Sequence, residues 1–256
     1  MIDSRASVDS SARLSPDVSV GPFSVIGRDV EIGAGTWIGP HVVIQGPTRI
    51  GKNNRIFQFA SLGGIPQDKK YTGEATWLEI GNNNTIFEFV TINRGTAQDK
   101  GKTVIGNDNW IMAYVHIAHD CSLADNVILA NNTTLAGHVL IEEWAVLGGF
   151  TKVHQFCRIG AHSFTGMNVD ITRDVPPYVM AAGSPIEPRG INSEGLLRRN
   201  FTTEQIRNIK NAYRLVYRSE LRLEEAIIRL EEKASTQPEV ARMLNFLKSS
   251  ERGITR

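Results

Sequence analysis

The sequence predicts a mainly β protein, a parallel β-helix of triangular coils followed by a C-terminal α-helical domain. Three observations support this prediction. An aliphatic residue recurs at every sixth position from Ile2 to Leu62, a spacing that fits neither an α-helix nor a flat strand. A small or β-branched residue stands four positions after most of these aliphatic residues. Beyond Ser193 the apolar spacing becomes helical.

Each six-residue repeat supplies one short strand of a coil. The repeat resumes in phase at Ile80, restarts one residue late at Ile105 and continues to Ile159. Three repeats close one coil of 18 residues, with the aliphatic and the small positions both pointing inward. Successive coils lie about 4.8 Å apart, so residues 18 apart in sequence become vertical neighbours. Glycine often follows the aliphatic residue, as at Gly21 and Gly148, and we expect these glycines to turn the corners with positive φ.

The composition is that of a globular protein that buries a core, with 256 residues and 41% hydrophobic content. No signal segment or apolar run of membrane-spanning length is visible, and we predict a cytoplasmic protein. Cys121 and Cys157 lie 36 residues apart, which is two coils or about 10 Å, too far for a disulfide. The formal net charge is +1, but Lys and Arg outnumber Asp and Glu only from residue 185 onward.

We predict a β-helix domain over residues 1–184 and an α-helical domain over residues 185–256. The boundary falls in a proline-rich segment, after the six-residue repeat fades. Thr202 to Gln205 form a capping box ahead of the first long helix, and later helices are expected around Leu223 to Lys233 and from Pro238 to Leu247. These helices would cap the open end of the coil.

Three further segments are candidate binding elements. Residues 63–79 and residues 94–103 interrupt the coil, and loops that leave a rigid scaffold usually carry function. The third segment is a stripe of basic residues at helical spacing: Arg207, Lys210, Arg214 and Arg218. Such a stripe is usually a solvated face, but it could dock an acidic carrier protein. Nucleic acid is a weaker expectation, because no aromatic platform accompanies the stripe.

The 18-residue rule gathers several histidines and their neighbours on one patch. It predicts two adjacent columns: His119, Gly137 and Gln155 in one, and Asp120, His138 and Phe156 in the other. An imidazole can accept a proton near neutral pH, and a backbone N–H one coil away can stabilise an oxyanion. Asp120 or another carboxylate would orient the ring. The patch therefore predicts acyl transfer to a hydroxyl group.

Other interpretations of the histidines stay open at this point. Surface histidines are often only solvated. His116, His119 and His138 could bind zinc across neighbouring subunits, as in a hydratase on the same scaffold. A repeat protein can also be non-catalytic and only present a surface. Metal analysis separates the zinc enzyme from the acyltransferase.

Several segments resemble the acyl-[acyl-carrier-protein]:UDP-N-acetylglucosamine O-acyltransferase family, and the resemblance spans almost the whole chain. The segments are His116–Cys121, Leu129–Val139, Val153–Cys157, Asp174–Val179 and Glu194–Arg199. The resemblance implies a left-handed β-helix and a homotrimer with active sites between neighbouring subunits. It also implies the first committed step of lipid A (lipopolysaccharide) biosynthesis, in which acyl carrier protein donates a 3-hydroxyacyl chain to the 3-hydroxyl of UDP-N-acetylglucosamine.

The same resemblance implies roles for individual residues. His119 would be the general base, Gly137 the backbone oxyanion donor and Asp120 the carboxylate paired with the base. The implied substrate-binding residues are Gln67, Asp68, Lys70, His116, His138, His154, Gln155, Asn192, Glu194, Arg198 and Arg199. No cofactor or metal is implied, since the thioester supplies the activated acyl group and no phosphate-binding glycine loop or paired cysteine cluster is present.

Two positions concern substrate choice. Asn93 stands where the family usually has histidine, and the acceptor could be the ordinary sugar or a 3-amino analogue. Met167 occupies the position that closes the acyl groove in the family. It lies 48 residues from His119, about 13 Å of groove at the strand spacing, which predicts a medium chain such as 3-hydroxydecanoyl. A related N-acyltransferase is a rival that usually carries an additional N-terminal domain, whereas the coil here begins at Ile2.

Overall fold

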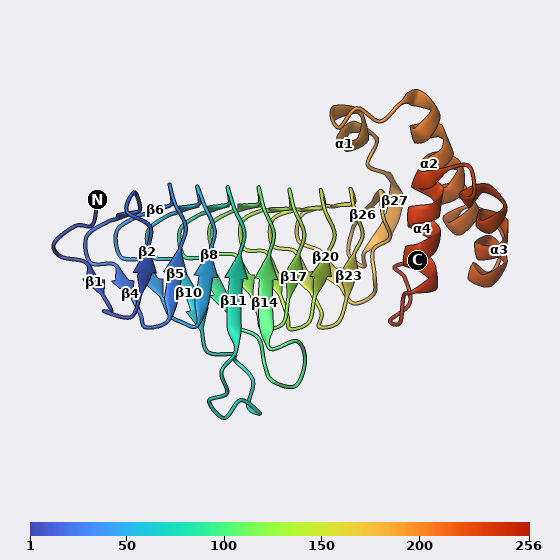
Figure 1. Ribbon diagram of the computed structural model, residues 1–256. Helices are drawn as coiled ribbons and strands as arrows, with labels where there is room; N and C mark the ends of the chain where they lie inside the picture. The colour runs from blue at the N-terminus through green and yellow to red at the C-terminus, as the bar shows by residue number, and fades with distance from the viewer.

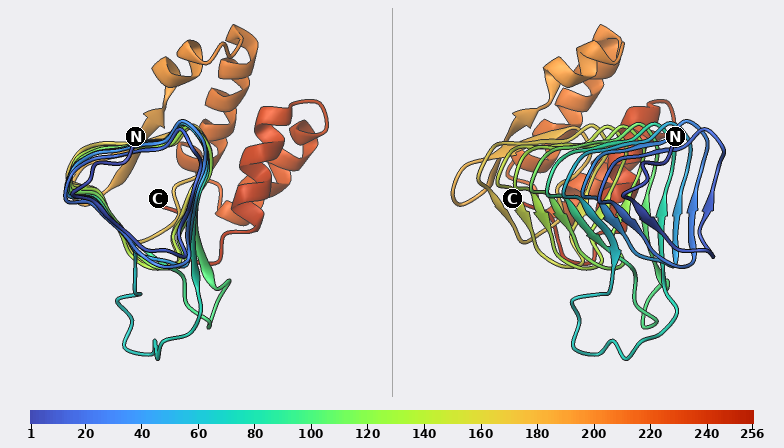
Figure 2. Two further views of the ribbon diagram at one scale, coloured as in Figure 1. Left: turned by 60° about the vertical axis from the view of Figure 1, so that its left-hand side comes forward. Right: turned by 90° about the vertical axis from the view of Figure 1, so that its left-hand side faces the viewer.

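Short strands wind into a prism of stacked triangular coils, and the coils end against a group of helices (Figures 1 and 2). The computed structural model describes residues 1–256. Three sheets form the faces of the prism, and every pairing between successive coils is parallel. The predicted left-handed parallel β-helix with a helical C-terminal region is confirmed.

Each sheet takes every third strand along the chain. The first sheet consists of β1 (Ser7–Val8), β4 (Val25–Ile26), β7 (Val43–Ile44), β10 (Ser61–Gly64), β13 (Thr91–Asn93), β16 (His116–Ile117), β19 (Thr134–Leu135), β22 (Lys152–Val153) and β25 (Asp170–Ile171). The second sheet consists of β2 (Arg13–Leu14), β5 (Val30–Ile32), β8 (Thr48–Ile50), β11 (Trp77–Ile80), β14 (Lys102–Ile105), β17 (Ser122–Leu123), β20 (Leu140–Ile141) and β23 (Arg158–Ile159). The third sheet consists of β3 (Ser19–Val20), β6 (Trp37–Ile38), β9 (Arg55–Ile56), β12 (Thr85–Ile86), β15 (Trp110–Ile111), β18 (Ile128–Leu129), β21 (Val146–Leu147), β24 (Phe164–Thr165), β26 (Val179–Ala182) and β27 (Glu187–Ile191).

The aliphatic and small positions of the repeat fill the inside of the prism, as predicted. Ile38, Ile117 and the small residue Thr133 are all fully buried, because a triangular coil leaves room only for side chains that alternate in size. Both cysteines also point inward and are free thiols, so the prediction of no disulfide is confirmed. Burial raises the pKa of the Cys121 thiol to about 12, which keeps it protonated.

The prediction of positive φ at the glycines that follow an aliphatic residue is wrong. Gly63 is the single exception among them. Positive φ occurs instead two residues later, at corner positions such as Phe23 and Phe150. Gly21 is needed for a different reason, since a Cβ there would lie 2.7 Å from the backbone of Gly39. These glycines therefore allow successive coils to stack closely.

Two loops leave the prism at one corner, between the first and second sheets (Figure 2). We call residues 65–76 the long loop and residues 94–101 the short loop. The first spans β10 to β11 and the second spans β13 to β14. The corners of the next three coils on this edge are residues 118–121, 136–139 and 154–157. We call this edge the site corner, because it carries both loops and the predicted histidine columns.

Four helices follow the prism: α1 (Ser193–Arg198), α2 (Thr203–Tyr217), α3 (Leu223–Ala234) and α4 (Pro238–Lys248). The predicted capping box is confirmed, since Gln205 N–H donates to Thr202 Oγ1 at 3.2 Å and Thr202 N–H donates to Gln205 Oε1 at 2.8 Å. Thr255 N–H donates to the carbonyl of Asp174 on the last coil, which ties the end of the chain to the prism. None of these helices has the length and apolar character to cross a membrane.

The two-domain division at residues 184 and 185 stays a prediction. Strand β27 begins just after this point and pairs antiparallel with β26, so the third sheet continues past it. The Tyr213 hydroxyl on α2 donates to the carbonyl of Pro188 in β27 at 3.0 Å. The helices are thus attached to the prism through this final hairpin as well as through the end of the chain.

Candidate active site

The two predicted columns are present on the site corner. A Cβ on Gly137 would lie 2.7 Å from Cε1 of His119, so the ring lies against the glycine of the next coil. The backbone N–H of His138 donates to the carbonyl of His119 at 3.0 Å, and that of Phe156 donates to the carbonyl of Gly137 at 3.2 Å. Residues 18 apart are therefore vertical neighbours here, as the repeat predicted.

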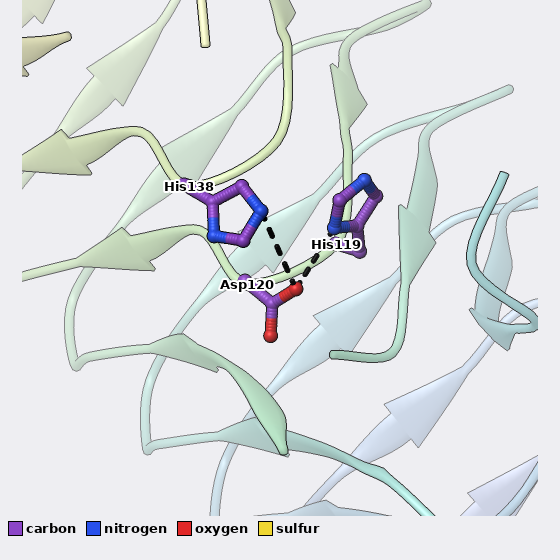
Figure 3. A group of neighbouring side chains, drawn as sticks. All are labelled: His119, Asp120 and His138. Atoms are coloured by element: carbon purple, nitrogen blue, oxygen red, sulfur yellow. Dashed lines mark hydrogen bonds and ion pairs between the residues drawn. The ribbon is translucent and has the colours of Figure 1, made fainter. Parts of the chain in front are cut away.

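His119 and Asp120 form a hydrogen-bonded pair (Figure 3). Nδ1 of His119 lies 2.8 Å from Oδ2 of Asp120, whose side chain is completely buried. An ionised carboxylate only accepts hydrogen bonds, so Nδ1 carries the ring proton and Nε2 keeps its lone pair. Asp120 adopts φ 60°, and this left-handed corner brings two successive side chains to the same side. The pair has the geometry of an oriented general base.

The short loop holds Asp120 from behind. Thr96 N–H donates to Oδ1 of Asp120 at 2.9 Å, and the Thr96 hydroxyl donates to Oδ2 at 2.7 Å. The backbone N–H of Asp120 donates to the Thr103 hydroxyl at 2.8 Å. Sequence reasoning missed Thr96. The sequence indicated residues 94–103 as a binding element, but no period within this segment indicates which side chain turns inward.

His138 lies between two carboxylates. Its Nδ1 is 2.8 Å from Oδ2 of Asp99 on the short loop, and its Nε2 is 3.9 Å from Oδ2 of Asp120. The ring stacks on Phe156 at 4.4 Å between centroids and meets the His119 ring edge-on at 5.1 Å. Asp99 is a second residue that the sequence did not indicate. Two elements therefore fix this ring, the coil and the short loop.

The remaining histidines differ in their surroundings. His116 on β16 hydrogen-bonds through Nδ1 to the Thr91 hydroxyl at 2.7 Å. Burial lowers the pKa of the His116 imidazole, and the neighbouring His119 lowers it further, which favours the neutral ring. His154 is exposed beside Gln155 at the far end of the column. His162 lies outside the columns, buried beneath Tyr178 and Phe201.

A single chain does not bring all the predicted residues together. Gln67, Asp68 and Lys70 lie on the long loop, which leaves the site corner. The four tail residues lie at α1, on another side of the prism (Figure 2): Asn192, Glu194, Arg198 and Arg199. Asn192 caps α1 and donates through Nδ2 to the carbonyl of His162 at 2.9 Å.

Met167 also lies away from His119. Asn168 N–H donates to the carbonyl of Gly149 at 2.7 Å, which places Met167 on the corner between the third and first sheets. The spacing of 48 residues is not a multiple of 18, so the predicted groove cannot run straight along one corner of one chain. The Met167 side chain is 72% exposed and available to a neighbouring molecule.

The site also contains a group of possible metal ligands, which differs from the predicted set. Ligand atoms of His119, Asp120 and His138 lie within 4.8 Å of one another, whereas His116 is not among them. The atoms His119 Nδ1 and Asp120 Oδ2 are already bonded to each other. A metal on these atoms would have to replace that hydrogen bond.

Comparisons with known proteins give the same family over the whole chain. The family model described as Udp N-acetylglucosamine O-acyltransferase, domain 2, matches residues 174–255, and the model described as bacterial transferase hexapeptide (six repeats) matches residues 29–64 and 102–137. The acyl-[acyl-carrier-protein]–UDP-N-acetylglucosamine O-acyltransferase of Herminiimonas arsenicoxydans is 58% identical, over 100% of this chain and 99% of its own. Its counterpart in Janthinobacterium sp. (strain Marseille) is 59% identical over the same shares.

Solved structures agree with this similarity. The Francisella novicida UDP-N-acetylglucosamine acyltransferase superposes with a TM-score of 0.98 at 44% identity, covering 100% of this chain and 94% of that one. The Moraxella catarrhalis UDP-N-acetylglucosamine O-acyltransferase superposes with a TM-score of 0.97 at 43% identity, covering 100% and 99%. The coils and the helices are therefore both shared with these enzymes.

Proposed function

Because the chain belongs to the family of acyl-[acyl-carrier-protein]–UDP-N-acetylglucosamine O-acyltransferases, we propose that His119 is the general base of its reaction. The enzyme is an acyltransferase that moves an acyl chain from acyl carrier protein to UDP-N-acetylglucosamine, the first step of lipid A biosynthesis. The observation that supports the role of His119 is its pairing: Nδ1 is bonded to buried Asp120, which leaves Nε2 free to accept a proton.

The proposed chemistry is a single addition and elimination at the thioester. Nε2 of His119 removes the proton from the sugar 3-hydroxyl as its oxygen attacks the thioester carbonyl. The Gly137 N–H makes no hydrogen bond within the chain and is available to the oxyanion that forms. The tetrahedral intermediate then collapses, the C–S bond breaks, and the imidazolium returns its proton to the carrier thiolate. Asp120 stabilises the imidazolium throughout.

We propose a homotrimer in which each site lies between two protomers. The tail residues and Met167 lie away from the site corner, so a neighbouring copy has to supply them. Exposed aromatic residues gather on the third sheet and its corner with the first: Phe23, Trp37, Phe59, Phe89, Trp110, Tyr114 and Phe150. An apolar stripe of this kind suits burial against another copy. Sedimentation of a monomer at micromolar concentration would contradict this assembly.

A Met167 side chain from a neighbouring copy would close the acyl groove and select a medium chain, with 3-hydroxydecanoyl as the proposed donor. A panel of acyl carrier protein thioesters tests the assignment. The wild type should prefer the ten-carbon chain, and Met167→Gly should move the preference to longer chains. A wild-type preference for fourteen carbons, or an unchanged preference in the variant, would refute it.

We propose that charged groups on the long loop and in the C-terminal helices bind the two substrates. Lys70 on the long loop and the α1 arginines suit the phosphates of UDP-N-acetylglucosamine. An acidic carrier protein could dock on four exposed basic residues of α2 and its C-cap: Arg207, Lys210, Arg214 and Arg218. We propose that the enzyme is cytoplasmic. The KM for the carrier should rise with ionic strength, and a salt-independent KM would count against docking there.

Substitution of the base tests the proposal directly. His119→Ala should lower kcat by about 10²- to 10⁴-fold, the usual contribution of a positioned base. Lys52→Ala is the control for truncation of a surface side chain, because Lys52 is exposed on the corner between β8 and β9, away from the site corner. Both variants should keep the wild-type melting temperature. Near-normal turnover by His119→Ala would remove this residue from its proposed role.

A further inference from the structure

The short loop contacts the site through buried groups, although it is an insertion in the coil. Thr96 is 1% exposed and Asp120 is 3% exposed. Both oxygens of the Asp120 carboxylate are engaged by Thr96, Oδ1 by its backbone N–H and Oδ2 by its hydroxyl. Oδ2 accepts a second hydrogen bond from Nδ1 of His119. The hydroxyl of Thr96 and the ring of His119 thus meet on one oxygen atom.

This arrangement fixes the orientation of the carboxylate. Rotation of the Asp120 side chain would break both bonds to Thr96 together with the bond to His119. The buried carboxylate therefore offers Oδ2 to the ring in a single position, which sets where the Nδ1 proton lies and where Nε2 points. We propose that Thr96 is a positioning residue, which sets the His119 base through Asp120. This inference rests on the proposed role of His119.

Other contacts anchor the short loop, so the Thr96 hydroxyl can be removed without releasing the loop. Gly95 N–H donates to the carbonyl of Trp77 at 3.2 Å, and the Arg94 guanidinium donates to the Gly46 carbonyl and to the Tyr71 hydroxyl. The backbone N–H of Thr96 remains with Asp120 whatever side chain stands at this position. Loss of the hydroxyl alone should therefore leave the loop in place and free only the Oδ2 side of the carboxylate.

Two substitutions at Thr96 separate positioning from packing. Thr96→Val keeps the shape and removes the hydroxyl, whereas Thr96→Ser keeps the hydroxyl and removes a methyl group. Thr96→Val should lower kcat about 10- to 100-fold, the effect expected when an orienting partner is lost, with little change in either KM. Thr96→Ser should stay within about threefold of the wild type. Nitrogen-15 spectra of labelled histidine should show one Nδ1–H tautomer for His119, and a mixture in Thr96→Val.

The outcomes are distinguishable from a failure of the base assignment. Thr96→Val with full kcat and an unchanged His119 spectrum would overturn the positioning role while His119→Ala remained inactive. Equal losses in Thr96→Val and Thr96→Ser, with a lowered melting temperature, would also overturn it, because they would indicate packing. An active His119→Ala would instead overturn the proposed function. A loss in Thr96→Val that Thr96→Ser rescues at unchanged stability supports the inference.

Discussion

The long loop and the short loop leave the same corner one coil apart, yet they are held in different ways. The short loop places Thr96 and Asp99 against Asp120 and His138, and its first residues are buried. The long loop carries exposed Gln67 and Lys70, and it is bonded through the Ile65 carbonyl to Asn93 and through the Tyr71 hydroxyl to Arg94. Anchoring therefore supports two different proposed roles, which the sequence could not separate: the short loop orients the proposed base, and the exposed long loop offers groups for substrate binding.

The difference follows from what each loop can reach. Strand β13, which precedes the short loop, pairs with β16, and His119 follows β16 directly on the corner. The long loop begins one coil further away, after β10. The only side-chain bond of the long loop to the start of the short loop is from Arg94 to the Tyr71 hydroxyl at 3.1 Å. Substitutions in the short loop should therefore act on kcat, and those in the long loop on KM.

The largest loss of activity should come from Asp120→Asn, which alters the carboxylate that the short loop contacts. The new amide would have to donate either toward Thr96 or toward His119, and donation to Nδ1 would move the ring proton to Nε2 and abolish the base. We expect kcat to fall on the order of 10³- to 10⁴-fold, as in a serine protease triad that loses its carboxylate. Steady-state kinetics with both substrates measure the loss. A variant with near-normal kcat would show that the Asp120 carboxylate, which the short loop contacts, has no part in catalysis.

A smaller effect of the opposite kind is expected from Lys70→Ala. Its ammonium is exposed on the long loop, and loss of a hydrogen bond to a charged phosphate costs about 1.5–3 kcal/mol. The KM for UDP-N-acetylglucosamine should rise about 10- to 100-fold while kcat and the melting temperature change little. Lys69→Ala is the matched control, since this neighbouring lysine is equally exposed. Equal effects of the two substitutions would indicate general charge attraction in place of a specific contact.

The coil was predictable because its six-residue period repeats regularly along the chain, and the same period placed His119 beside Gly137. The prediction was weaker wherever two physical causes demand the same residue. Gly21 was expected to supply positive φ, but a glycine is equally required where a Cβ would strike the next coil. The left-handed positions carry residues such as Phe23 and His41. Their rings stack on one another at 5.1 Å between centroids, and this packing offsets the strain of the left-handed backbone.

The two loops show where prediction from the repeat stops working. The 18-residue rule holds only while each coil keeps its length, and the register across the two insertions is 30 residues for Leu62 and Ile92 and 25 residues for Ile92 and Ile117. Within an insertion no period indicates which side chain turns inward, so Thr96 and Asp99 gave no signal. The role of Met167 stays a prediction, because distance along the coil axis says nothing about which corner a residue occupies.

The smallest expected effect comes from Tyr71→Phe, which removes the bond between the loops. Its hydroxyl accepts from Arg94 and donates to the carbonyl of Glu74 at 3.1 Å. A net hydrogen bond contributes about 0.5–1.5 kcal/mol, so the KM for UDP-N-acetylglucosamine should rise about two- to tenfold with kcat unchanged. Combination with Thr96→Val tests independence, because effects of uncoupled sites add in free energy. A double variant whose loss departs from the sum by more than about 0.5 kcal/mol would show that the two loops act as one unit.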